Sequence, residues 1–144
     1  MTTPLVLLIH ASATFAMVGL IWFVQVVHYP LFGCVGPEVF PKFAQLHQRR
    51  TTWVVAPIML TALATGLWLV VAPLPSLPTW QSWTGLALLA AIWISTACLQ
   101  VPLHGRLTVG YDPQAHRWLV RTNWLRTLAW TARGVLVCGM LLAG

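Results

Sequence analysis

The stretch that decides the fold is HYPLFGCVGPEVFPKFAQLHQRR, residues 28–50, which joins the first two long apolar runs of the chain. It contains two of the five histidines, one of the two acidic residues and three of the eight basic residues. A residue before proline is pushed out of helical geometry, so His28-Tyr29-Pro30 ends the first run. Pro37 and Glu38 suit the first turn of a helix. This pattern predicts a short interfacial helix that leads into the second run.

The composition indicates a protein surrounded by lipid. Of the 144 residues, 58% are hydrophobic and 7% are charged, whereas a soluble domain has about 25% charged residues. Four apolar runs could each cross a hydrocarbon core of about 30 Å, at about residues 4–27, 52–72, 80–101 and 119–143. The sequence therefore predicts an all-α fold: an integral membrane four-helix bundle, a single transmembrane domain over residues 1–144, with the interfacial helix between spans 1 and 2.

The basic residues indicate the orientation of this bundle. The net charge is +6, and most of the basic residues fall at one end of the predicted bundle: Lys42, Arg49, Arg50, Arg106, Arg117 and Arg121. The positive-inside rule places that end in the cytoplasm of a bacterial inner membrane, with both termini outside the cytoplasm. Charges at span ends argue against nucleic acid as a partner. Membrane lipid is the expected partner, and so small a bundle is compatible with a homo-oligomer.

Polar residues within the spans point to a buried site. Asn123, Arg126, Trp130 and Arg133 share one face of the fourth span, and Gln100 ends the third. An arginine near the bilayer centre costs at least about 2.5–3.5 kcal/mol, and the four spans contain no Asp or Glu. These five residues are therefore candidates to bind the anionic or phenolic group of an apolar aromatic or quinone-like molecule. The alternative is that carbonyls and hydroxyls satisfy Arg133.

Three histidines from different segments are predicted at the cytoplasmic boundary of the membrane: His28, His47 and His104. Imidazole is the commonest protein ligand for transition metals and also binds haem iron. The three are candidate ligands of haem b or of iron, copper or zinc. The alternative is that they are polar residues at a water boundary, bonded to carbonyls. His10, near the opposite surface, is a secondary polar site expected to form a helix-to-helix hydrogen bond.

Several other chemistries are excluded by residue type. A di-iron site in a helical bundle needs inward carboxylates, which the spans lack. The sequence has no HExxH motif and no phosphate-binding glycine loop. Its serines have no acid nearby for a catalytic triad, and its three cysteines have no CxxC spacing. Acid–base chemistry therefore falls to histidine.

Over nearly its whole length the chain resembles small bacterial four-span membrane proteins of unknown function that are similar to anthrone-oxygenase-like proteins. The resemblance rests on residues 28–32 (HYPLF), Phe43, His47, Pro102, His104, residues 121–127 (RTNWLRT) and Arg133. It implies an oxygenase or oxidase that acts on apolar aromatic compounds. A weaker resemblance, carried by His10 and Arg133, is to the four-span haem-binding protoporphyrinogen oxidase.

Taken together, these features predict a membrane-embedded redox protein, oxidase-like or oxygenase-like, with haem- or metal-dependent oxidoreductase activity. Two other classes stay open. A small carrier or channel with a pathway lined by histidine and arginine would show flux that depends on Arg133. A non-enzymatic membrane subunit would co-purify with a stable partner and carry neither cofactor nor flux.

Overall fold

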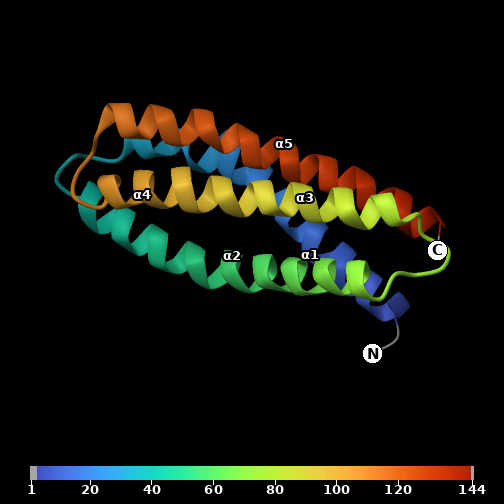
Figure 1. Ribbon diagram of the computed structural model, residues 1–144. Helices are drawn as coiled ribbons and strands as arrows, with labels where there is room; N and C mark the ends of the chain where they lie inside the picture. Colours follow the sequence, from blue (N-terminus) through green and yellow to red (C-terminus); the bar gives the residue numbers. More distant parts are fainter. Residues whose placement is uncertain (1–2, 144) are drawn as a thin grey trace.

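The computed structural model describes residues 3–143 and has an all-α fold (Figure 1). α1 (Thr3–Phe23) continues through a π-helical turn, η1 (Val24–His28), into a 3-10 turn, η2 (Pro30–Cys34). α2 (Phe40–Val71) follows; α3 (Thr79–Ser95) then continues through a second π-helical turn, η3 (Thr96–Gln100), into α4 (Val101–Leu107), and α5 (Pro113–Ala143) completes the bundle. These segments form four helices long and apolar enough to cross a membrane. The predicted all-α four-helix bundle is confirmed.

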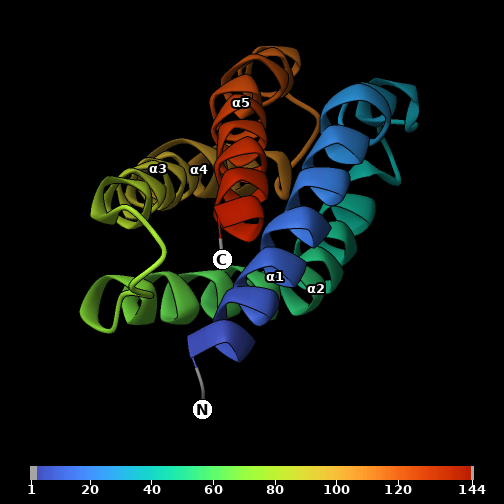
Figure 2. The same cartoon turned by 90° about the vertical axis from the view of Figure 1, so that its right-hand side faces the viewer.

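The four rods run antiparallel to their neighbours in the chain, so both ends of the described chain lie at the same end of the bundle (Figure 1). Viewed from that end, α5 lies between α1 and α3, and α2 crosses beneath them (Figure 2). The opposite end carries the connections from η2 to α2 and from α4 to α5. We call it the basic end, because most of the arginines lie there.

Three apolar clusters form the interior. A central cluster packs Met17, Ile21, Met59, Leu89, Ile92 and Trp130. An aromatic cluster at the basic end contains Tyr29, Phe32 and Phe40, and an aliphatic cluster near the termini contains Leu7, Leu69 and Val137. Large apolar side chains also cover the outside, where lipid is their expected surroundings.

The connection after the first span folds back over the bundle. Pro30 starts the 3-10 turn, and this turn buries Phe32 against the ring of Phe43, 5.2 Å between centroids. The helix predicted after Pro37 is present, but it is the first part of α2 and not a separate interfacial element. Residues 42–50 favour continuous helix because they are mostly strong helix formers without glycine or proline. The short separate helix between the spans is η2.

Both π-helical turns come just before a proline. The N–H of Tyr29 donates to the carbonyl of Val24, 2.9 Å away, and the N–H of Val101 donates to that of Thr96. Pro30 and Pro102 have no N–H to continue the ordinary i to i−4 ladder, so the preceding residue bonds five positions back. Each π turn rotates the residues beyond it relative to a regular helix, and both turns border the cavity described next.

Candidate functional site

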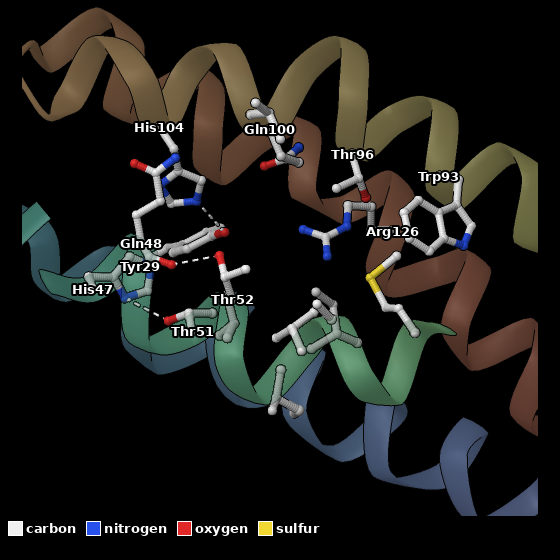
Figure 3. Close-up of a pocket in the computed structure, with 17 residues that line it drawn as sticks. Tyr29, His47, Gln48, Thr51, Thr52, Trp93, Thr96, Gln100, His104 and Arg126 are labelled. Atoms are coloured by element: carbon white, nitrogen blue, oxygen red, sulfur yellow. Dashed lines mark hydrogen bonds between the residues drawn. The ribbon is translucent and has the colours of Figure 1, made fainter. Parts of the chain in front are cut away.

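A cavity of about 220 Å³ lies between α1, α2, the η3–α4 segment and α5 (Figure 3). Its apolar walls include Val24, Val55 and Met59, and its polar lining includes Tyr29, His47, Trp93, Thr96, Gln100, His104 and Arg126. An apolar cavity of about 150 Å³ holds benzene, whereas typical ligand pockets have roughly 300–1,000 Å³. The volume suits a small aromatic compound and not a porphyrin.

Arg126 projects its guanidinium into this cavity from α5 (Figure 3). The residue is 5% exposed. Its Nη1 donates to Asn123 Oδ1 at 3.2 Å, and Asn123 Nδ2 donates to Gln25 Oε1 at 2.9 Å. Its Nε has no hydrogen-bond partner among residues 3–143. Asn123 and Gln25 therefore fix the orientation of Arg126 and leave donors free for a ligand.

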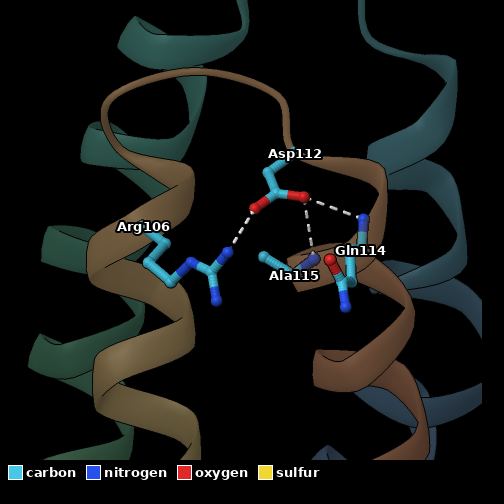
Figure 4. Close-up of polar contacts among 4 residues, drawn as sticks. All are labelled: Arg106, Asp112, Gln114 and Ala115. Carbon is cyan, nitrogen blue, oxygen red and sulfur yellow. Dashed lines mark hydrogen bonds and ion pairs between the residues drawn. The ribbon is translucent and has the colours of Figure 1, made fainter.

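Neither acidic residue neutralises Arg126. Glu38 is exposed, outside the cavity. Asp112 forms an ion pair with Arg106, 2.8 Å between Nη2 and Oδ2, and its other oxygen caps α5 (Figure 4). Hydrogen bonds from the backbone of Ala115 and Gln114, with the nearby Arg106, lower the pKa of Asp112 below its ordinary value of 3.8. The charge of Arg126 is left for a group from outside the chain.

Gln100 adds an unmet acceptor on the wall opposite α2. It is 2% exposed, and its Nε2 donates to Thr122 Oγ1 at 3.0 Å, which leaves Oε1 without a partner in the described chain. The indole Nε1 of Trp93, which also lines the cavity, is unpartnered as well. Buried polar atoms are nearly always hydrogen-bonded. The cavity therefore offers donors to ligand oxygens and an acceptor to a ligand hydrogen.

A phenol and an imidazole share a hydrogen bond at the basic end of the cavity. The Tyr29 oxygen lies 2.9 Å from His104 Nε2, and both residues line the cavity. This pair can take up or release a proton next to a bound molecule. Tyr29 was not among the predicted site residues. The signal that could have found it is its place between His28 and Pro30, where the helix must turn.

The three candidate metal ligands are adjacent. His28 Nε2 lies 2.8 Å from His47 Nδ1, and the rings of His47 and His104 are 5.3 Å apart between centroids. Across residues 3–143, however, no three His, Cys, Asp or Glu side chains are arranged to hold a metal ion. The ring nitrogens point at each other and at Tyr29 instead of at a common point. His28 and His47 thus form one hydrogen-bonded pair and His104 and Tyr29 form another, with no hydrogen bond between the two pairs in the described chain.

Arg133 and His10 form a separate polar network nearer the termini. Arg133 is 1% exposed; its Nη1 donates to the Gly85 carbonyl and its Nη2 to His10 Nε2, 3.1 Å away. Its guanidinium also lies 5.6 Å from the ring of Trp130. His10 Nδ1 is 2.8 Å from Thr65 Oγ1. The helix-to-helix hydrogen bond predicted for His10 is confirmed, and the guanidinium of Arg133 has partners within the chain.

The predicted site residues thus fall into three groups. Gln100, Arg126, His47 and His104 line one cavity. Asn123 and His28 stand directly behind this lining, bonded to Arg126 and His47. Trp130, Arg133 and His10 lie outside the cavity lining, although sequence periodicity placed two of them on the face of Arg126.

Comparison of the chain with known proteins gives no relative. No protein family, no curated protein and no solved structure matches it. The function must therefore be inferred from the chemistry of the cavity itself.

Proposed function

We propose that the chain is a membrane-embedded oxidoreductase that binds an apolar aromatic or quinone-like compound through an anionic or phenolic oxygen. The observation that carries the proposal is the buried guanidinium of Arg126, which projects into a largely apolar cavity with no acidic partner. Hydrogen bonds to a charged group contribute about 1.5–3 kcal/mol. In a ligand with an oxygen anion on a flat apolar body, the anion would pair with Arg126 and the apolar body would pack against the apolar walls of the cavity.

The Tyr29–His104 pair supplies the acid–base step. The O–H bond of a bound phenol breaks, its proton moves to this pair, and the oxygen keeps the electron pair as a phenolate facing Arg126. No electron leaves the substrate in that step. The phenolate is the electron-rich form that an oxidant, either dioxygen or a membrane quinone, then oxidises.

The haem or transition metal predicted from His28, His47 and His104 stays a prediction. The cavity is small for a porphyrin, and the imidazoles are bonded to each other or to Tyr29. The proposal therefore gives His104, which is bonded to Tyr29, a role in moving protons and routes no step through a metal.

Binding of 1-hydroxy-2-naphthoate, a bicyclic phenol with a carboxylate, tests the proposal. Titration of the purified protein in lipid nanodiscs, followed by tryptophan fluorescence, should show saturable binding. Arg126→Gln should weaken it at least about tenfold, which corresponds to about 1.4 kcal/mol. Arg121→Gln is the matched control, because Arg121 is an exposed arginine on the same helix outside the cavity lining.

Equal affinities of Arg126→Gln and the native protein would contradict the binding site. Oxygen or quinone consumption with a bound phenol tests the redox half separately. Tyr29→Phe should slow that consumption and leave the affinity nearly unchanged, because Tyr29 handles the proton and Arg126 holds the oxygen. Binding of the phenol without consumption of oxygen or quinone would contradict the redox activity and show that the protein only binds the compound.

The charge distribution supports a bacterial inner membrane with the basic end in the cytoplasm. The cavity then opens toward the cytoplasmic leaflet, and both termini lie outside the cytoplasm. This orientation is part of the proposal.

A further inference from the structure

A second hollow, of about 520 Å³, adjoins the cavity at the basic end. It is formed by α2 and the residue that follows α4, and its lining is Gln45, Gln48, Arg49, Thr52, Trp53 and Thr108. We call it the basic-end groove. Gln48 and Thr52 line both the groove and the cavity, so the two spaces meet at these side chains.

The cavity reaches the surface between α2 and α4. Thr52 and Val101, which line it from these two helices, are both exposed. Figure 3 shows Thr52 beside Gln48 at the edge of the cavity, and the Thr52 hydroxyl donates to the Gln48 carbonyl at 2.7 Å. One side-chain hydrogen bond joins α2 to the chain just after α4 among residues 3–143, from Gln45 Nε2 to the Thr108 carbonyl at 3.4 Å. The opening is therefore held by weak contacts.

The chemistry of the groove differs from that of the cavity. Its lining is amides, hydroxyls, one exposed indole and the arginine Arg49. Such a mixture is typical of the level where lipid headgroups meet water. Arg49 has no ion-pair partner among residues 3–143, and it sits about 15 Å along α2 from Met59 at the deep end of the cavity.

We propose that the basic-end groove is the entrance to the cavity, through which an amphiphilic anion passes from the membrane surface. Arg49 attracts the anionic group at headgroup level, and Arg126 receives it inside. The ligand is then a weak acid with a flat apolar body that concentrates at the membrane surface. This inference rests on the proposed function for the identity of the ligand, but the route can be tested without one.

The test measures the reaction of a cysteine inside the cavity with a small anionic reagent. Cys34, Cys98 and Cys138, all exposed, are replaced by serine, and Thr96→Cys places one thiol in the cavity lining. The protein is placed in lipid vesicles with 2-sulfonatoethyl methanethiosulfonate in the water. The rate of modification then reports access from the membrane surface.

Thr52→Trp should slow the modification at least about tenfold, because an indole fills the place where groove and cavity meet. Gln48→Trp should slow the modification in the same way. This second variant keeps the test valid if Thr52→Trp does not fold. Val54→Trp is the matched control, since Val54 is exposed on α2 and lines neither space. Arg49→Gln should slow the reaction severalfold at low salt only, whereas Arg50→Gln should not.

Equal rates for Thr52→Trp, Gln48→Trp and Val54→Trp would overturn the entrance, because the reagent would then reach the cavity elsewhere. The same rate for Arg49→Gln and Arg50→Gln at low salt would overturn the role of Arg49. No bound ligand is needed. Failure of naphthoate binding would therefore overturn the proposed function and leave the entrance result standing.

Discussion

At the scale of single residues, the network of Arg133 shows how this chain tolerates an arginine among lipid-facing helices. Arg133 Nη2 can only donate, so His10 Nε2 must accept and the hydrogen of the imidazole must be on Nδ1. That hydrogen is donated to Thr65 Oγ1, whose own hydroxyl donates to the Thr61 carbonyl at 2.6 Å. The chain of donors ends on a backbone oxygen, and each link depends on the previous one.

His10→Leu should destabilise the protein strongly. The change removes one hydrogen-bond acceptor from the buried guanidinium of Arg133, and a hydrogen bond to a charged group contributes about 1.5–3 kcal/mol. The double variant His10→Leu with Arg133→Met removes the charge as well and should recover most of the loss. Thermal unfolding in detergent measures both. A double variant as unstable as the single one would contradict this account.

Arg126 differs from Arg133 because it borders the cavity and has fewer hydrogen-bond partners on its Nη atoms. Among residues 3–143, the Nη atoms of Arg133 donate to Gly85 and His10, whereas those of Arg126 donate to Asn123 alone, and the Nε of each arginine lacks a partner. The two arginines are seven residues apart on one helix, and their roles follow from what the neighbouring helices present to each of them.

At the scale of the elements, α5 begins with a well-defined cap. Asp112 Oδ1 accepts from the backbone N–H groups of Gln114 and Ala115, at 2.8 and 3.1 Å, and Pro113 takes the first helical position. This is why α5 begins at Pro113, six residues before the predicted start of the fourth span.

The cap should make stability depend on pH in the acid range. The pKa of Asp112 is lowered in the fold, so its contribution is complete above the ordinary value of 3.8 and is lost as the pH falls through the lower folded value. Asp112→Asn keeps a capping side chain and should remove that dependence. Asp112→Ala should lower Tm at neutral pH. Melting curves from neutral to acid pH check both, and identical acid profiles for native and Asn variants would contradict the account.

The π-helical turn η3 sets the positions of Gln100 and His104. Pro102→Ala restores an N–H that can bond to the carbonyl of Cys98, which favours a regular α-helix through this region. If the π turn becomes a regular α-helical turn, the residues beyond it rotate by about 100° relative to those before it, and so does that side of the cavity. We expect weaker naphthoate binding with an unchanged or higher Tm. Unchanged affinity would show that the π turn does not position these side chains.

At the scale of the whole molecule, the bundle is chemically asymmetric. The cavity, four of the five histidines and the basic-end groove lie toward the basic end, whereas the end with the termini has His10, an aliphatic cluster and an uncharged proline-rich loop. The basic residues and the cavity therefore lie at the same end of the bundle, which would face one leaflet of a membrane. A ligand that concentrates in that leaflet needs no route through the rest of the bundle.

The proposed orientation predicts the behaviour of fusion proteins. Alkaline phosphatase joined to the C-terminus should be active in a bacterial host, because that enzyme folds only outside the cytoplasm, and green fluorescent protein at the same place should be dark. Exchange of Arg49, Arg50, Arg117 and Arg121 for glutamine should weaken this preference, since it removes the charge difference between the two ends. A bright fluorescent fusion of the native chain would contradict the orientation.

The sequence by itself determined the spans and the fold class. Hydrophobic length fixes where a helix can cross lipid, and this signal is local, so the four helices were predicted near their observed positions. Helical spacing also grouped Asn123, Arg126, Trp130 and Arg133 on one face. The helix predicted after Pro37 is not separate from the second span, because neither glycine nor proline interrupts residues 42–50, and the separate short helix is η2 instead.

Only the tertiary structure decided which polar residues meet. Arg126 and Arg133 share a helical face, yet one borders a cavity and the other is bonded to His10 and Gly85, because different helices oppose them. The π turns before Pro30 and Pro102 shift Tyr29 and His104 in a way that regular helical counting cannot give. Contacts between side chains distant in sequence depend on helix packing, and a local pattern contains no record of that packing.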